Sequence, residues 1–304
     1  MERTDTLVVQ QPGYRVETVV SGLRLPITVQ ADAGGLLIAL QDGRVVRADG
    51  TLVYDVSALV PADLNFVGGL LNLLVANGRA FAFLTTEDDK VLVAELHPAR
   101  VDTLILADGF GVQHHGGGLG LYRGELLAAF GDGDTGSGRG AGLNGRLIGV
   151  NLATRMRREL ARGLRNPWRM ALHGDSLWIA DAGDRAWEEI NLLDLTRPGA
   201  DFGWGISEGP DCNTGKVCSG VTWPRYAYPT GAGCSTVVGA AWFDGRFWFG
   251  DYCYGWVRSL GSGVPRHHLD VGDRIVSIAQ TAPETAPYLV TGGGRVLRVV
   301  EVGK

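Results

Sequence analysis

Short apolar or alternating runs recur along the chain, and each is followed by a turn and a second run of the same kind. The first pair is Gly35–Leu40 with Gly43–Arg47, and the last is Pro287–Val290 with Gly294–Val299. Alternation of apolar and polar positions predicts β-strands, and a turn between two such runs predicts a hairpin. The pairs between them are Arg79–Leu84 with Lys90–Ala94, Gly124–Phe130 with Gly145–Val150, Ser176–Ala180 with Glu189–Leu193, and Arg246–Phe249 with Gly255–Arg258.

One further short run precedes each of these hairpins and is expected to form an inner strand. These runs are Ile27–Val29, Leu70–Leu74, Gly118–Leu121, Arg169–Leu172, Val237–Trp242 and Ile275–Ile278. A unit of four short strands that recurs at roughly 40 to 50 residues is typical of a β-propeller. We therefore predict an all-β chain, a single domain over residues 1–304, built as a six-bladed propeller of four-stranded antiparallel blades. A pair of β-sandwiches is the alternative, but nothing divides the chain into halves.

A propeller ring needs a strand from one terminus to pair with the other end of the chain. Tyr14–Val20 alternates well and is expected to complete the last blade beside Arg295–Val299.

Glycine supplies 46 of the 304 residues, about twice its average usage of ~7%, which is typical of a chain with many tight turns. The net charge is −5 and no long basic run is present, which argues against nucleic-acid binding. No apolar run approaches the ~20 residues of a membrane span.

Four cysteines fall in one short region, and their number allows three pairings. We expect Cys212–Cys218, which closes a local loop, and Cys234–Cys253, which brackets one hairpin-sized segment. A zinc site is the alternative, but it prefers a tighter Cys-x-x-Cys spacing that the chain lacks. Disulfides favour an oxidising compartment, so we expect a periplasmic or extracellular protein. The first residues contain no apolar core of a signal peptide, which would mean a processed or trimmed chain.

Polar residues just before the inner strands are expected to line the central funnel of a propeller. His114 and His115 precede three glycines and an inner strand, and a histidine there could take a proton from a substrate hydroxyl. The alternative is a turn whose histidines are only polar and exposed. His267 and His268 have no such setting and are expected in a loop.

Arg165 and Asn166 form a second candidate, because Pro167 forces Asn166 out of the helical region and could aim both side chains at one point. An arginine suits carboxylates and other oxygen anions. The alternative is a salt bridge or a clamp on backbone carbonyls. The third candidate is a set of carboxylates that suits calcium. It comprises Asp181, Asp184, Glu188 and Glu189, with Asp132 and Asp134 as a weaker candidate of the same type.

Several of these motifs, in this order, resemble the soluble quinoprotein sugar dehydrogenases and their relatives, a group that includes glucose/sorbosone dehydrogenase-like proteins and the propeller of hedgehog-interacting protein. The motifs are Gly68–Leu71, His114–Gly117, Gly131–Gly133, Gly163–Pro167, Glu188–Asn191, Phe202–Trp204 and Phe249–Cys253. The last of them is closest to the subgroup that resembles hedgehog-interacting protein. The resemblance implies a six-bladed propeller, in agreement with the strand pattern.

The resemblance also implies a set of roles around pyrroloquinoline quinone (PQQ) and calcium. His114 would be the base that takes the hydroxyl proton of a sugar or related alcohol, and Arg165 with Asn166 would contact the reactive carbonyl region of the quinone. The backbone at Gly183 and Asp184 would hold the calcium ion bound to the quinone. Glu189 and the carbonyl of Phe202 would form a second, structural calcium site.

The chain departs from the family at its cationic positions. The lysine that pairs with the quinone carboxylates falls near Cys253, and a pair of arginines is reduced to Arg274. Each lost charge-assisted hydrogen bond is worth about 1.5–3 kcal/mol. The leading hypothesis is a PQQ-type oxidoreductase that acts on a small-molecule sugar or alcohol. The alternatives are a propeller that has lost the quinone and binds a carbohydrate or a protein, and a different reaction in the same funnel with His114 as the base.

Overall fold

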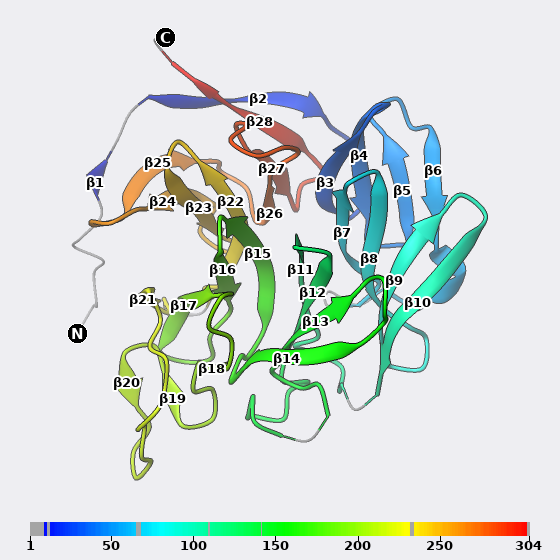
Figure 1. Cartoon of the computed structure of the whole chain (residues 1–304). Helices are drawn as coiled ribbons and strands as arrows, with labels where there is room; N and C mark the ends of the chain where they lie inside the picture. Colours follow the sequence, from blue (N-terminus) through cyan, green and yellow to red (C-terminus); the bar gives the residue numbers. More distant parts are fainter. Residues whose placement is uncertain are drawn as a thin grey trace.

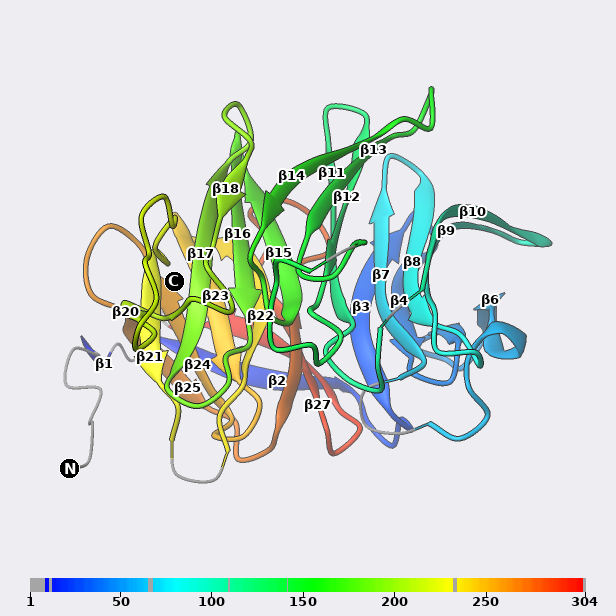
Figure 2. The same ribbon diagram turned by 90° about the horizontal axis from the view of Figure 1, so that it is seen from below.

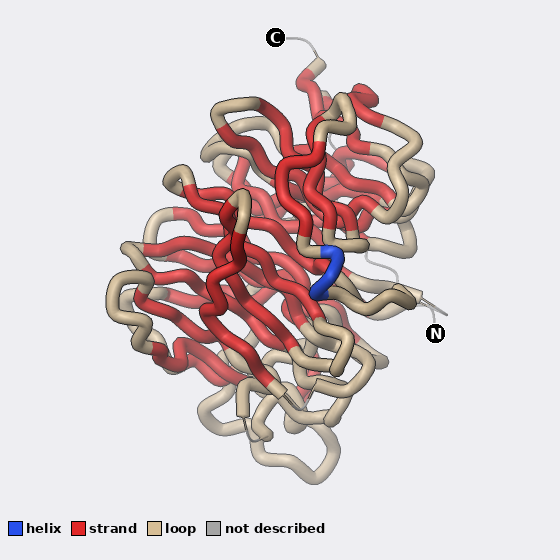
Figure 3. The backbone as a smooth tube through the Cα atoms, turned by 90° about the vertical axis from the view of Figure 1, so that its right-hand side faces the viewer, coloured by secondary structure: helices blue, strands red, loops and turns tan. Residues whose placement is uncertain are grey.

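The computed structural model describes residues 9–10, 13–64, 68–108, 110–140, 142–231 and 234–302. Six β-sheets stand around a central axis (Figure 1), and a two-stranded ribbon lies outside them. Each sheet contains four strands paired antiparallel, and two sheets gain a short fifth strand that pairs parallel at the outer edge. The described residues contain one short helix, η1 (Ser57–Leu59), which is coloured blue in Figure 3. The prediction of a six-bladed propeller is confirmed.

The first three blades run in chain order, and each begins with its innermost strand. The first contains β3 (Pro26–Asp32), β4 (Gly35–Leu40), β5 (Arg44–Arg47) and β6 (Leu52–Asp55). The second contains β7 (Leu70–Ala76), β8 (Arg79–Thr85), β9 (Val91–His97) and β10 (Arg100–Ala107), and Figure 2 shows β10 reaching away from the ring. The third contains β11 (Gly116–Tyr122), β12 (Glu125–Phe130), β13 (Leu147–Asn151) and β14 (Arg157–Arg162), with β18 (Ala200–Asp201) at its edge.

The remaining blades complete the ring. The fourth contains β15 (Pro167–His173), β16 (Ser176–Asp181), β17 (Trp187–Asp194) and β21 (Tyr226–Pro229). The fifth contains β22 (Val237–Phe243), β23 (Arg246–Asp251), β24 (Trp256–Leu260) and β25 (Arg266–Asp270), with β1 (Val9–Gln10) at its edge. The sixth contains β26 (Ile275–Ala279), β27 (Tyr288–Thr291), β28 (Val296–Glu301) and β2 (Tyr14–Val20). The outer ribbon is β19 (Ser207–Glu208) with β20 (Asp211–Cys212).

The N-terminal strand closes the ring, as predicted. β2 pairs antiparallel with β28, in a register that runs from Tyr14 opposite Glu301 to Val20 opposite Val296. The hydrophobic core lies between the blades. Each of the six apolar clusters joins residues of two neighbouring blades, and together they pass around the whole ring. Each blade therefore buries both of its faces against its neighbours, which is why a single blade has no core of its own.

Every inner strand changes register near its start. The register shifts lie at Pro26/Thr28, Leu70/Asn72, Gly116/Gly118, Pro167/Arg169, Val238/Ala241 and Ile275/Ser277. Such a β-bulge places two residues opposite one and redirects the side chains that follow. Neighbouring residues of one strand can therefore face different cavities, and this is the case for Trp168 and Arg169.

Both predicted disulfides, Cys212–Cys218 and Cys234–Cys253, are present, which excludes a zinc site on these cysteines. The prediction of a loop at His267 and His268 is wrong, because both lie in β25. His267 is buried and bonded to Asp270, and His268 stacks on the ring of Trp248. No helix among the described residues is long and apolar enough to cross a membrane.

Candidate functional site

His114 lies in the turn that leads into the inner strand β11 and has a left-handed backbone with a φ of 53°. Its carbonyl accepts a hydrogen bond from the amide of Gly133 at 3.1 Å. The backbone packs so closely here that a Cβ at Gly131 would lie 1.9 Å from the His114 carbonyl oxygen. The turn therefore holds the imidazole in one place, with 14% of the side chain exposed.

Asp132 fixes the orientation of that imidazole. Its buried carboxylate lies 2.9 Å from Nδ1 of His114 and also accepts hydrogen bonds from the indole of Trp204 and from the amides of Asp134 and Gly136. Burial alone would raise the pKa of Asp132, but the hydrogen bonds from His114 and Trp204 outweigh it and lower the pKa below its usual range. The oxygens of Asp132, which the sequence suggested as a weaker calcium ligand, therefore already accept hydrogen bonds from these donors. The ionised Asp132 keeps Nδ1 as a donor and leaves Nε2 of His114 as the acceptor.

Arg165 and Asn166 are held by the end of the neighbouring strand β16. The carboxylate of Asp181 accepts hydrogen bonds from the backbone amide of Arg165 at 3.1 Å and from that of Asn166 at 2.6 Å. The guanidinium of Arg165 donates to the carbonyls of Ala182 and Gly183 and forms an ion pair with Asp184 at 3.0 Å. The side chain thus makes the carbonyl clamp and the salt bridge that were the alternative interpretation of this motif.

A chain of contacts joins Arg165 to His114. The guanidinium carbon of Arg165 lies 5.2 Å from the centre of the Trp204 ring, and the indole N–H of Trp204 donates to Asp132 at 2.8 Å. The amide of Asp132 donates in turn to the carbonyl of Arg165 at 2.7 Å. The two residues, which lie far apart in the sequence, therefore share one polar cluster with Asp132 and Trp204 at its centre.

A cavity of about 660 Å³ opens where the inner strands begin, and we call it the upper cavity. Its lining includes Asn166, Trp168, Tyr252, Cys253, Asp273 and Arg274. The side-chain oxygen of Asn166 accepts a hydrogen bond from the amide of Gly116 at 3.1 Å, so this wall is continuous with the turn of His114. The indole of Trp168 donates to the carbonyl of Val276 at 2.9 Å. The volume of the cavity lies in the range of small-molecule sites, roughly 300–1,000 Å³.

The upper cavity has few cationic groups. Arg274 is the only arginine or lysine among its described lining residues, and its guanidinium carbon lies 5.5 Å from the centre of the Tyr252 ring. The neighbouring Asp273 is paired with Arg295 at 3.0 Å. Cys253 lines the cavity as half of a disulfide. The buried carboxylate of Asp251 holds that loop, since it accepts hydrogen bonds from the amides of Cys253 and Tyr254.

Buried carboxylates gather behind Arg165. Glu189 accepts hydrogen bonds from the amide of Gly209 at 2.6 Å and from the side chain of Asn191 at 3.1 Å. Burial, together with the nearby charge of Asp181, raises the pKa of Glu189 to about 8. The side-chain oxygens Oε1 of Glu188 and Oδ1 of Asn191 are buried without a hydrogen-bond partner in the described part of the chain. Unpartnered oxygen acceptors beside crowded carboxylates suit a hard cation such as calcium.

The proposed calcium ligands divide into two groups. Glu189 and Asn191 lie together in β17, while Phe202 is buried in the segment that follows β18. The carbonyl of Gly183 and the carboxylate of Asp184 are both engaged by the guanidinium of Arg165. A cation held at Gly183 and Asp184 would therefore share these oxygens with Arg165.

In the absence of divalent cations, the folded protein should lose stability as the pH rises from 5 to 8. Burial raises the pKa of Asp181 to about 7 and that of Glu188 to about 8, above their ordinary values of 3.8 and 4.5. The folded chain therefore binds more protons than the unfolded chain in this window, and the free energy of unfolding falls with pH. We expect thermal unfolding in a chelator to show a transition temperature several °C lower at pH 8 than at pH 5. A transition temperature that stays constant or rises with pH would contradict the raised pKa values of these two buried carboxyl groups.

Comparison with solved structures shows which proteins share the fold of this chain. The aldose sugar dehydrogenase of Streptomyces coelicolor, solved in its PQQ-bound form, is 21% identical, with a TM-score of 0.77 over 95% of this chain and 98% of that chain. A putative oxidoreductase (glucose dehydrogenase) of Thermus thermophilus is 22% identical, with a TM-score of 0.77 over 95% of this chain and 100% of that chain. The chain has the fold of these sugar dehydrogenases. No family profile matches the chain, and no curated protein matches its sequence.

A more distant structure shares the fold as well. The PQQ domain of pyranose dehydrogenase from Coprinopsis cinerea, in its holo form, is 12% identical, with a TM-score of 0.60 over 94% of this chain and 95% of that chain.

The contact between Asp132 and Trp204 at the site could not be predicted from the sequence. Both belong to short motifs that carry the family resemblance, but their contact joins positions 72 residues apart and depends on how the third and fourth blades pack.

Proposed function

We propose that this chain is an oxidoreductase of the quinoprotein sugar dehydrogenase type, which oxidises a sugar or related alcohol with PQQ and calcium in the upper cavity. The observation that carries the proposal is the partly buried pair of His114 and Asp132, 2.9 Å apart, in a turn that is hydrogen-bonded to Asn166, which lines a cavity of suitable volume. A carboxylate that fixes one imidazole nitrogen leaves the other as a base, an arrangement that recurs in enzymes that take protons from hydroxyl groups.

Each residue of the polar cluster has its own role in the proposed reaction. Nε2 of His114 accepts the proton of the substrate hydroxyl, and the ionised Asp132 stabilises the imidazolium that forms. Trp204 and Arg165 hold Asp132 in place through the contacts described above. A positioned base of this kind contributes about 10²–10⁴-fold to the rate.

The upper cavity fits a planar quinone in part. Trp168 offers an aromatic surface, Asn166 an amide, and Arg274 a cation for one carboxylate. The bound quinone would supply the acceptor for the hydride that leaves the alcohol. Because Cys253 stands where the family has a lysine, we expect weaker quinone binding than a cavity with two cations would give. The loss of one charge-assisted bond is worth about 1.5–3 kcal/mol.

Calcium should raise the thermal stability of the protein through Glu189. The ion would neutralise a carboxylate that is buried beside Asp181 and would occupy acceptors that lack donors, including Oδ1 of Asn191. Phe202 would add its carbonyl, and Gly183 with Asp184 would hold the ion bound to the quinone. We expect millimolar calcium to raise the transition temperature of the wild type by several °C at pH 7.5. Magnesium should do less, because it demands a stricter geometry.

Glu189→Gln provides the matched comparison for this prediction, because it keeps the shape of the side chain and removes its charge. The variant should lose most of the calcium-induced shift. An equal shift in the wild type and in the variant would contradict a calcium site at Glu189.

The activity is tested by reconstitution with PQQ and calcium, followed by dye reduction with a panel of aldoses and simple alcohols. Turnover that requires both the quinone and calcium would support the proposal. If the reconstituted protein reduces no dye with any substrate of the panel, the dehydrogenase proposal is wrong. The two disulfides favour an oxidising compartment, which is periplasmic or extracellular.

The scarcity of cations in the upper cavity favours one alternative, a propeller that binds a carbohydrate or a protein partner without the quinone. His114→Ala distinguishes the two. Loss of turnover with normal ligand binding is the result expected of an enzyme, whereas a binding module would show ligand binding without turnover in the wild type as well.

A further inference from the structure

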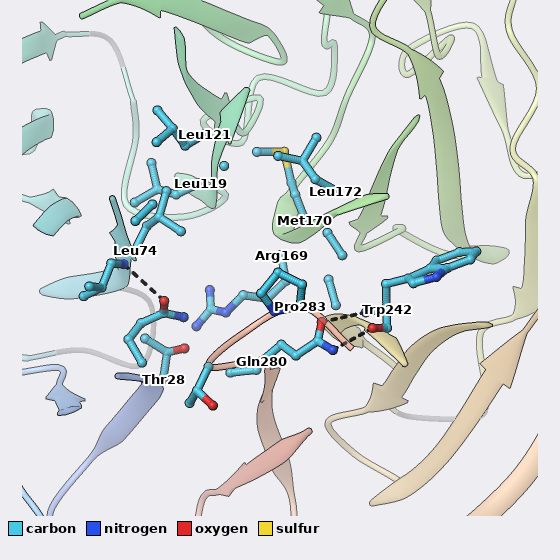
Figure 4. A pocket seen from close by; sticks show the side chains of 18 of the residues that line it. Thr28, Leu74, Leu119, Leu121, Arg169, Met170, Leu172, Trp242, Gln280 and Pro283 are labelled. Atoms are coloured by element: carbon cyan, nitrogen blue, oxygen red, sulfur yellow. Dashed lines mark hydrogen bonds between the residues drawn. The ribbon is translucent and has the colours of Figure 1, made fainter. Parts of the chain in front are cut away.

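A second cavity, of about 460 Å³, opens where the inner strands end, and we call it the lower cavity (Figure 4). Trp168 lines the upper cavity, whereas the next residue, Arg169, lines the lower one. The same division holds for Ile27 and Thr28 and for Val276 and Ser277. These neighbours sit at the β-bulges of their strands, so one layer of inner-strand residues separates the two cavities.

Arg169 is a buried cation without a counter-ion. The residue is 4% exposed, and its guanidinium donates to the hydroxyl of Ser277, to the carbonyl of Ile27 and to the carbonyl of Trp168. The Trp168 ring lies 4.5 Å from its guanidinium carbon. No carboxylate of the described residues forms an ion pair with it, and burial lowers its pKa. Each terminal nitrogen keeps one further N–H, and a buried charge that lacks an opposite charge is costly.

Several polar side chains that line the lower cavity with Arg169 can donate hydrogen bonds. Thr28 and Gln30 are among them. The side-chain oxygen of Gln30 already accepts the amide of Val75 at 3.1 Å, which leaves its NH₂ group as a donor. The hydroxyl of Ser277 accepts from Arg169 and therefore points its own proton elsewhere. A buried guanidinium without a counter-ion, with further side-chain donors in the same lining, is the chemistry of an anion site.

The rest of the cavity is apolar. Figure 4 shows Arg169 in the middle of the cavity, with leucine and methionine side chains on one side of it. The apolar lining includes Leu74, Leu119, Leu121, Met170, Leu172 and Ile278. At the mouth, His173 stacks on Trp242 with ring centres 4.0 Å apart, and Glu284 adds a negative charge. Hydrophobic walls and a volume far above that of one ion suit a ligand with an apolar body.

We propose that the lower cavity binds a monocarboxylate with a short apolar chain, whose carboxylate accepts hydrogen bonds from Arg169 and whose chain lies among the leucines. A second carboxylate would meet no further arginine or lysine among the described lining residues and would approach Glu284 at the mouth. The site is separate from the upper cavity, so it does not depend on the quinone or on the proposed dehydrogenase reaction.

Hexanoate is a suitable probe, with hexan-1-ol as the matched neutral compound and sodium chloride as the matched inorganic anion. At a hexanoate concentration tenfold above its Kd, the transition temperature of the full chain should rise by about 2 °C. Hexan-1-ol and chloride at the same concentration should give less than half of that shift. Equal shifts with hexan-1-ol would show that the guanidinium is not used, and equal shifts with chloride would show that the apolar chain is not used; either result overturns the proposal.

Two variants locate the site. Arg169→Met keeps an unbranched but shorter side chain, removes the guanidinium, and should weaken hexanoate binding at least tenfold. If this variant does not fold, Gly120→Met decides the question, because Gly120 lines the cavity beside its leucines and none of the three atoms nearest to a Cβ there belongs to Arg169. An added Cβ at Gly120 meets only the flexible end of Leu172 at 3.4 Å and the side chain of Leu127 at 3.9 Å, so the fold should tolerate it.

Gly120→Met should abolish the hexanoate shift, and an unchanged shift would overturn the proposal. Titration calorimetry with PQQ present provides the last comparison. Hexanoate should bind equally well with and without the quinone. Competition between hexanoate and the quinone would place hexanoate in the upper cavity and would overturn the proposal.

Discussion

His114→Gln is expected to lower kcat by about 10²–10⁴-fold, the contribution of a positioned general base. Glutamine can still bond to Asp132, but it offers no nitrogen that takes a proton near neutral pH. The fold should survive, because the turn is held by the backbone bond between His114 and Gly133, which the substitution does not touch. Steady-state kinetics of the reconstituted enzyme, with Kd for the quinone measured separately, tests this prediction.

His115→Gln is the matched control for His114→Gln. His115 lies next to His114 in sequence, but it is buried, and a ring nitrogen meets the carbonyl of Gly111 at 2.9 Å, away from Asp132. Its replacement should change kcat by much less than tenfold. A similar loss in both variants would show that the turn, rather than the base, was damaged. An unchanged kcat in His114→Gln would remove His114 from the chemistry.

Gly183→Ala should lower the stability of the fold by about 3 kcal/mol or more, the upper part of the range for overpacking against backbone. A Cβ at Gly183 would lie 1.6 Å from the carbonyl oxygen of Trp187 and 2.7 Å from its carbonyl carbon. Those atoms belong to the first residue of the strand β17, which is held in place by its pairing with Pro229 of β21. The transition temperature should fall by about 6 °C or more.

Gly140→Ala serves as the control for this steric effect. A Cβ at Gly140 has no atom within 4 Å, and its backbone needs no positive φ. The control should change the transition temperature by no more than about 2 °C. A loss of less than 1 °C in Gly183→Ala would mean that the turn after β16 is not packed as described.

The blades could be predicted from the sequence because their signal is local. Alternation in runs such as Arg79–Leu84 reflects strands whose neighbours in the chain are also their partners in the sheet. The closing strand was predictable for a related reason, since Tyr14–Val20 alternates well and lies before the first repeated unit. The error at His267 and His268 arose because β25 is short and polar, and its burial comes from packing against β24 and Trp248.

The site was less accessible to prediction because its decisive contacts join distant positions. The sequence placed His114 and Arg165 before inner strands, but the role of Asp132 depends on Trp204, which is brought in by a loop of the fourth blade. The absence of a counter-ion at Arg169 could not be predicted from the sequence either. An arginine in an inner strand is visible in the sequence, but the absence of a counter-ion depends on β3 and β26, more than 100 residues away.

Titration calorimetry of PQQ in the presence of calcium tests the central claim most directly, with Arg274→Gln as the variant and Arg123→Gln as its control. Arg274 lines the upper cavity, whereas the side chain of Arg123 is 68% exposed and lies outside that lining. We predict saturable binding of one quinone per chain that requires calcium and weakens about 10–150-fold in Arg274→Gln, the equivalent of about 1.5–3 kcal/mol. Arg123→Gln should bind as the wild type does. The absence of saturable heat with the wild type, or an unchanged affinity in Arg274→Gln, would contradict quinone binding in the upper cavity.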